Sequence, residues 1–167
     1  MKRFIAKVKF SSILFTLLIL GTYTLKAQKA IMSGSPSSII SSTASIPEGT
    51  PLFFTSGFTA SAVNPDLKDG DYEKYGNTET QAISILEKIK AILTENGVSM
   101  GSIFSMKVYI SPDTKTGEYD FAGWNKAYVR YFGNEDNPNK PVRATVGVAT
   151  LVNPHKFIEI EVIATRN

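Results

Sequence analysis

The spacing of apolar residues along the chain predicts two amphipathic helices. In the clearer one, apolar side chains recur every three or four positions between Thr78, which forms a capping-box pair with Gln81, and the helix-ending pair Asn96-Gly97. A second helical pattern covers residues 120–132, with its aromatic side chains on one face. Both patterns are typical of helices that pack against another layer on one side only.

Shorter runs, in which apolar and polar residues alternate, predict strands. The runs are residues 41–46, 52–58, 103–110, 142–151 and 157–164. Turn-forming residues lie between the first two runs and again between the last two, so we expect a hairpin at each place. The element order ββαβαββ predicts an α+β domain with its helices on one face of a sheet.

The N-terminal part of the chain has the pattern of a secretory signal peptide. Four basic residues precede an apolar run at 13–20, which is far shorter than the ~20 residues that span a bilayer, and Ala27 fits a cleavage site. We therefore expect residues 1–27 to be removed, and the protein to be periplasmic or secreted without a membrane anchor. Residues 28–40 are Ser-rich and predict a flexible segment, which leaves residues 41–167 as one domain.

Removing the predicted signal changes the charge. The whole chain carries +3, but residues 1–27 hold five of its 18 basic residues and none of its 15 acidic ones, so the remainder carries −2. That balance, without a basic stripe, does not favour nucleic acid as a partner. The chain has no cysteine and one histidine, which argues against disulfides, a lipid anchor and a zinc site. We expect no cofactor.

A few polar residues lie in otherwise apolar strands and are candidates for a site. Arg143 sits among small and apolar residues, which fits either a structural ion pair at an interface or a guanidinium that binds a substrate carboxylate. Thr145 lies on the same strand face. Glu159 alternates with apolar neighbours, and is either solvated or part of a site. Ser56 and Gly57 end a strand, where Gly57 fits a bulge as well as a ligand contact.

Three segments of the chain have distinctive patterns. The C-terminal block, from Pro141-Val142-Arg143-Ala144-Thr145-Val146 to Ile158-Glu159-Ile160, is similar to the hallmark of the YjgF/RidA family of imine and enamine deaminases. Phe54-Thr55-Ser56-Gly57 resembles its strand end, and Asp120-Phe121-Ala122 with Asn125, Tyr128 and Phe132 resembles its second helix. The resemblance covers residues 41–165. It implies a chorismate-mutase-like fold and a homotrimer whose barrel-like core carries a site at each subunit interface.

The resemblance also implies roles for the candidate residues. Arg143 would bind the carboxylate of a 2-imino or 2-enamino acid, with Ser56 and Gly57 as further substrate contacts. Glu159 would orient the water that attacks the C=N carbon, beside Thr145 where many relatives carry cysteine. The products would be a keto acid and ammonia. The family's Gly-Pro-Tyr before the first strand is replaced here by Ile39-Ile40-Ser41, a departure that leaves open which substrate the protein takes and whether the activity is kept.

Two alternatives stay open from the sequence: a non-catalytic protein that binds small carboxylates or other metabolites and, less favoured by the charge, an endoribonuclease. The arrangement of the last two strands bears on the site. If they form a hairpin about residue 154, Glu159 lies opposite Val148 or Ala149, about 17 to 20 Å from Arg143. We therefore expect each site to combine Arg143 of one subunit with Glu159 of its neighbour.

Overall fold

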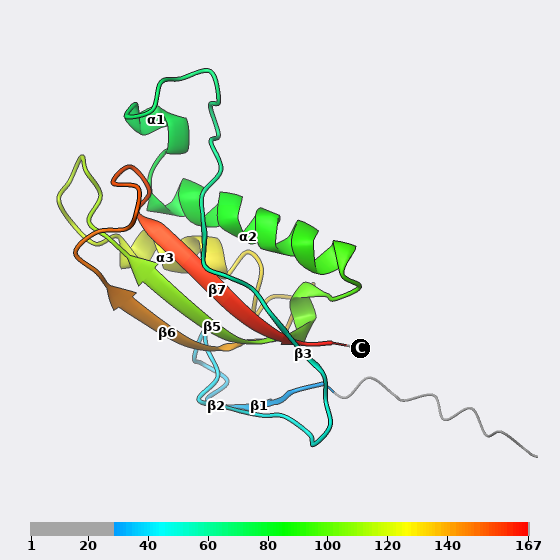
Figure 1. The fold of residues 1–167 in the computed structure, drawn as a ribbon. Helices are drawn as coiled ribbons and strands as arrows, with labels where there is room; N and C mark the ends of the chain where they lie inside the picture. Colours follow the sequence, from blue (N-terminus) through cyan, green and yellow to red (C-terminus); the bar gives the residue numbers. More distant parts are fainter. Residues whose placement is uncertain (1–28, 167) are drawn as a thin grey trace, which may run out of the picture.

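A computed structural model describes residues 29–166, so the predicted signal peptide at 1–27 lies outside the described residues. One five-stranded sheet has the order β3-β7-β5-β6, with β4 also paired to β7, and the two longer helices, at residues 78–95 and 121–128, lie on one face of it (Figure 1). This is the predicted α+β class. The elements are β1 (Ile31–Ser33), β2 (Thr43–Ser45), β3 (Leu52–Phe54), β4 (Phe58–Thr59), α1 (Tyr72–Tyr75), α2 (Thr78–Glu95), β5 (Ile103–Ile110), α3 (Phe121–Tyr128), β6 (Val142–Gly147) and β7 (Ile158–Thr165).

Helix α2 covers the sheet as its pattern predicts, but its cap differs by one residue. The Asn77 side chain, not that of Thr78, accepts the hydrogen bond from Thr80 N at 2.9 Å, and Gly97 follows the helix with φ +70°. Gln81 lies inside the helix and does not complete a capping box. The apolar stripe of α2 is fully buried against the sheet and consists of Ala82, Ile85, Leu86, Ile89 and Leu93.

The buried Gln81 amide ties the start of α2 to the start of β7. Its Nε2 donates to Gly76 O at 2.9 Å and to His155 O at 3.1 Å, and its Oε1 accepts from Phe157 N at 2.7 Å. All three partners are backbone groups that would otherwise be left without a hydrogen bond in or near the core. One side chain thereby fixes where β7 begins.

Strand β5 is the centre of the sheet. It pairs in parallel with β6, with Met106 opposite Arg143 and Tyr109 opposite Val146, and antiparallel with β7 on its other side. A parallel pair needs a crossover, and helix α3 supplies it between β5 and β6. β5 was predicted over residues 103–110, and its observed bounds are the same.

Both predicted hairpins are wrong. β2 pairs with β1, while β3 pairs with β7; β6 and β7 are separated by β5. The connection between β6 and β7 instead passes the end of β5, where Val148 N donates to Ile110 O and Ser111 N donates to Phe157 O. The alternation of apolar and polar residues shows which side chains share a face of the sheet, but not which strands pair. The central position belongs to β5, which is more deeply buried than β6.

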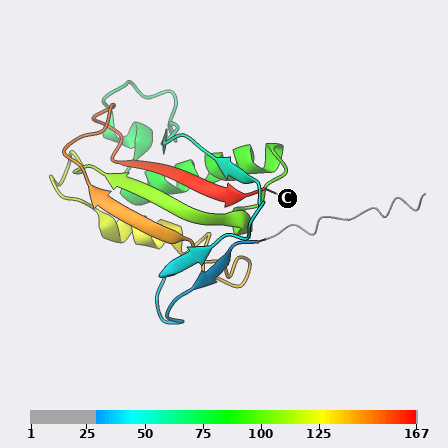
Figure 2. The same cartoon turned by 60° about the horizontal axis from the view of Figure 1, so that its bottom comes forward.

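The segment 28–40, predicted to be flexible and without regular structure, contains β1. This ribbon of β1 and β2 stands apart from the five-stranded sheet (Figure 2). Its loop is held to the body by Lys140 Nζ, which donates to Pro36 O at 2.9 Å and to Ser38 O at 2.8 Å. A lysine more than a hundred positions away in the sequence supplies contacts that local composition does not reveal.

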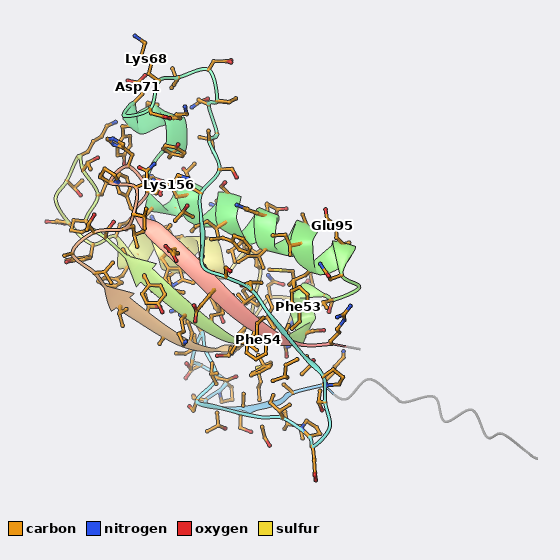
Figure 3. All side chains as sticks on the ribbon, in the orientation of Figure 1. Phe53, Phe54, Lys68, Asp71, Glu95 and Lys156 are labelled. Carbon is orange, nitrogen blue, oxygen red and sulfur yellow. The ribbon has the colours of Figure 1, made fainter. Side chains whose placement is uncertain are left out.

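The sheet face opposite the helices carries exposed apolar side chains. Phe54 is 64% exposed and Val146 is 45% exposed, while the neighbouring Phe53 turns to the core (Figure 3). Lys107 and Glu161 form an ion pair of 2.8 Å on this open face. None of the helices within residues 29–166 is both long and apolar enough to cross a membrane.

Replacing Gln81 by Leu should lower the free energy of unfolding by about 2–4 kcal/mol, because three backbone groups lose their partner. Urea denaturation at fixed protein concentration measures it. Glu95→Gln is the control, since Glu95 is exposed near the end of the same helix (Figure 3) and should change stability by less than about 0.5 kcal/mol. Similar small losses for both variants would contradict the anchoring role of Gln81.

Candidate functional site

Arg143 is a partly buried cation on the helix-covered face of the sheet. It points from β6 toward α3, where its guanidinium carbon lies 5.2 Å from the centre of the Trp124 ring and 4.5 Å from that of Tyr128. Its Nη2 donates to Asn125 Oδ1 at 2.8 Å. None of the ion pairs among residues 29–166 involves Arg143. The ion pair at an interface that we considered from the sequence would involve a second subunit, so it stays a prediction.

Helix α3 supplies the aromatic wall because of its cap and its spacing. Asp120 Oδ1 accepts from Gly123 N at 2.7 Å and starts the helix as predicted. Trp124, Tyr128 and Phe132 follow at intervals of four and are fully or almost fully buried. The Trp124 and Tyr128 rings meet edge to face at 5.6 Å, and those of Tyr128 and Phe132 stack at 5.0 Å. The helix ends at Tyr128, four residues earlier than predicted, and turns carry the chain to Gly133.

The contact of Arg143 with the aromatic rings affects two pKa values. Burial lowers the pKa of Arg143, and the neighbouring Tyr128 opposes that effect. Burial also raises the pKa of Tyr128 to about 12, against a smaller opposite effect of Arg143. An arginine keeps its charge at neutral pH even in such surroundings, and the tyrosine stays protonated. The site thus presents a cation beside a neutral hydroxyl.

Several buried polar atoms around Arg143 have no hydrogen-bond partner. They are Arg143 Nη1, Thr145 Oγ1, Trp124 Nε1 and Tyr128 Oη. Thr145 lies two residues beyond Arg143 on β6, opposite the buried Val108, and so shares its face. Buried polar groups normally find a partner. Four unpaired ones on neighbouring residues are therefore available to water, to a ligand or to another chain.

Glu159 lies on the opposite, open face of the sheet. It pairs with Tyr109 on β5 and with Thr59 on β4. Tyr109 in turn pairs with Val146 on β6, so Val146 lies in the same row across the sheet. Its carboxylate lies against Gly57: a Cβ at position 57 would be 2.8 Å from Glu159 Cδ and closer still to Oε1. Only glycine leaves room for this position of the carboxylate. Ser56, next to it, is exposed.

One chain does not bring Arg143 and Glu159 together. Their register partners on β5, Met106 and Tyr109, are three residues apart, and two strand spacings separate β6 from β7. At ~3.3 Å per residue and ~4.8 Å per strand, the two Cα atoms are about 14 Å apart, and their side chains leave opposite faces. The predicted separation rested on a hairpin that does not exist, but the separation itself remains.

The sequence predicts the aromatic face of α3, but not that Trp124, Asn125 and Tyr128 contact Arg143. Asn125 enters the prediction only as a match to the family's second helix. The useful signal was their spacing: residues i, i+1 and i+4 of one helix lie near one point of a neighbouring strand.

A hollow of about 470 Å³ adjoins the start of β5 and β6. Ile40 and Ser41, which replace the family's tyrosine, line it together with Lys107, Arg143 and Ala144. Lys107 and Ala144 lie on the open face of the sheet, so the hollow adjoins the backbone at Arg143 and not its guanidinium. Among residues 29–166, no three His, Asp or Glu side chains come together in a way that could hold a metal ion.

The similarity to known proteins covers most of the described chain. Residues 43–166 match the family described as endoribonuclease L-PSP. A RutC family protein of Pyrococcus horikoshii is 36% identical over 107 residues, which are 64% of this chain and 76% of that protein. The protein named putative reactive intermediate deaminase TdcF, of Escherichia coli K12, is 38% identical over 91 residues, 54% of this chain and 65% of that protein.

Solved structures extend the likeness to nearly the full length of the relatives. The crystal structure of E. coli TdcF with bound serine has a TM-score of 0.54 at 28% identity and covers 82% of this chain and 99% of that chain. A Rid-family protein of Yersinia pestis has a TM-score of 0.62 at 16% identity, with 84% and 100% covered, and shows the fold alone. Because the family match spans most of the chain and includes β6, β7 and α3, the protein belongs to the endoribonuclease L-PSP family, also called YjgF/RidA.

Proposed function

We propose that this protein hydrolyses 2-imino and 2-enamino acids to 2-keto acids and ammonia. The observation that carries the proposal is Arg143: a guanidinium half-enclosed by two aromatic rings, with no acidic partner among residues 29–166. A buried cation of this kind is stabilised by an anion from outside the chain. A carboxylate on the substrate would supply that charge and fix the substrate in place.

The relatives support the same chemistry. TdcF is named a putative reactive intermediate deaminase, and its crystal structure holds serine, a small molecule with a carboxylate and an amine. The substrates proposed here carry a carboxylate next to a C=N group. Binding through Arg143 would therefore hold the reacting carbon a fixed, short distance from the guanidinium.

The reaction needs a positioned water and a group that exchanges a proton. Water adds to the carbon of the protonated C=N group while the Glu159 carboxylate accepts a proton from it. The resulting carbon bears a hydroxyl and an amine. Proton transfer to nitrogen and loss of the hydroxyl proton then break the C–N bond, form the keto group and release ammonia. The Thr145 hydroxyl, unpaired beside Arg143, is available to hydrogen-bond the substrate or the water.

We further propose that the site forms between subunits of a homotrimer. Arg143 and Glu159 leave opposite faces of one sheet, so Glu159 of a neighbouring subunit would face the Arg143 side of the cleft. The open sheet face, with Phe54 and Val146 exposed, is the surface that such an assembly would cover. Gly57, which leaves room for the Glu159 carboxylate, would then belong to the same half of the site as Glu159.

The proposed activity is tested by generating imino acids with an amino-acid oxidase and following keto acid release. The wild type should accelerate release, and Arg143→Ala should reduce kcat/KM about a hundredfold or more, because the substrate carboxylate loses its cation. Arg143→Lys keeps the charge but loses the planar fork, so it should fall between the two. If the wild type binds pyruvate but accelerates the hydrolysis of none of the imino acids tested, the deaminase proposal is refuted and a carboxylate-binding protein is favoured.

Replacing Gly57 by Ala should reduce kcat about tenfold or more, because the new methyl group displaces the Glu159 carboxylate. The thermal unfolding midpoint should change little, since the displaced atoms end a flexible side chain and Gly57 has no positive φ. Gly101→Ala is the matched control, because a Cβ there meets nothing nearer than 3.4 Å. Equal activity in both variants would argue against a role for Glu159.

Replacing Val146 by Asp should weaken the assembly by placing a charge on the open sheet face. Light scattering coupled to size-exclusion chromatography should show smaller species for Val146→Asp as the protein is diluted. Val152→Asp makes the same chemical change at a fully exposed loop position and should leave the mass unchanged. If Val146→Asp keeps the wild-type mass at all concentrations, the open face is not the interface.

A further inference from the structure

The chain has a single tryptophan, and it lies directly against the proposed carboxylate-binding cation. Trp124 is fully buried, and its ring centre is 5.2 Å from the Arg143 guanidinium carbon. The Tyr128 ring contacts the same guanidinium at 4.5 Å and meets Trp124 edge to face. Arg143 is thus held by two rings at once, and cation–π contact is strongest with tryptophan.

The hydrogen bond of Arg143 leaves one of its buried nitrogens without a partner. Nη2 is occupied by the hydrogen bond to Asn125, whereas Nη1 is buried without a partner. A long arginine side chain has many rotamers in solution, and losing them on binding weakens a ligand. The rings and Asn125 restrict those rotamers beforehand, so that Nη1 stays available to a ligand.

The unpaired groups nearby also define the chemistry of that ligand. The indole N–H of Trp124 and Arg143 Nη1 are buried, unpaired and able only to donate hydrogen bonds. Tyr128 Oη and Thr145 Oγ1, also unpaired, can donate as well. A cluster dominated by donors beside a cation is complementary to an anionic oxygen group and not to an amine.

We propose that Trp124 is a positioning residue of this anion site: its ring holds the Arg143 guanidinium in place for the ligand, and its indole senses the charge that binds there. The inference rests on the carboxylate site proposed above, but it does not require that the bound molecule be hydrolysed. Phe132 provides the internal contrast. It lies in the same aromatic stripe and is 1% exposed, but it stacks on Tyr128, and the cation–π contacts of Arg143 within residues 29–166 are with Trp124 and Tyr128.

The first measurement uses the fluorescence of this tryptophan in the complete assembled protein. Pyruvate should cause a saturable change in emission, because a carboxylate at Arg143 alters the electric field at the neighbouring indole. Pyruvamide, which has the same size without the charge, should cause none at equal concentrations. Arg143→Ala retains the tryptophan and should abolish the response. Emission that stays constant while calorimetry shows pyruvate binding to Arg143 would overturn the inference.

The second measurement compares variants by calorimetry. Trp124→Leu removes the aromatic face and should weaken pyruvate binding about tenfold, whereas Trp124→Phe keeps a ring and should weaken it about threefold. Phe132→Leu removes a ring of the same stripe and should lower thermal stability without changing pyruvate affinity. If Phe132→Leu weakens binding as much as Trp124→Leu, the effect of Trp124 is general packing and the inference is wrong.

These outcomes separate the inference from the proposed function. Deaminase activity together with unchanged pyruvate affinity in Trp124→Leu would overturn the role of Trp124 and leave the enzyme proposal intact. A fluorescence response and a tenfold weaker Trp124→Leu in a protein that hydrolyses no imino acid would support the role of Trp124 and refute the enzyme proposal. Where activity is present, Trp124→Leu should raise KM about tenfold with little change in kcat, since Trp124 acts through Arg143 and not on the reacting carbon.

Discussion

The pairing of β5 on both of its edges determines where Arg143 and Glu159 lie. β5 holds β6 in parallel and β7 antiparallel, and these two ladders set the registers of Arg143 and Glu159. An inserted strand between them separates the two side chains along the sheet and across it. A site that uses both is consequently one that a single subunit cannot build. The fold and the proposed oligomeric site thus share one cause.

The environment of Arg143 shows how a charge can be kept in a largely apolar place. Burial opposes its charge and lowers its pKa, but two ring faces and one amide oxygen offset part of that desolvation. An acidic side chain in the same place would neutralise the guanidinium and compete with any ligand. Aromatic neighbours stabilise the cation without doing so, because a ring has no net charge.

Sequence patterns predicted where the helices and strands occur better than they predicted which strands pair. The helix at 78–95 and the strand at 103–110 followed from periodicity, and the family from the residues of β6, β7 and α3. The pairing of the strands could not be predicted in this way. The alternation of apolar and polar residues is the same whether a strand pairs with its neighbour in sequence or with β5. The contact between Trp124 and Arg143 depends on that pairing, so it could not be read locally. Export, which rests on residues 1–27, stays a prediction.

The Gln81 amide has a consequence for how the chain can vary in length. It holds the backbone at His155 and Phe157 from a helix outside the connection between β6 and β7, and Val148 is held to the end of β5 on the other side. Between these two attachment points the loop does not determine the register of the strands, and Val152 at its outer part is fully exposed. Insertions and deletions in this loop can therefore reshape the rim of the molecule while the registers of Arg143 and Glu159 stay the same.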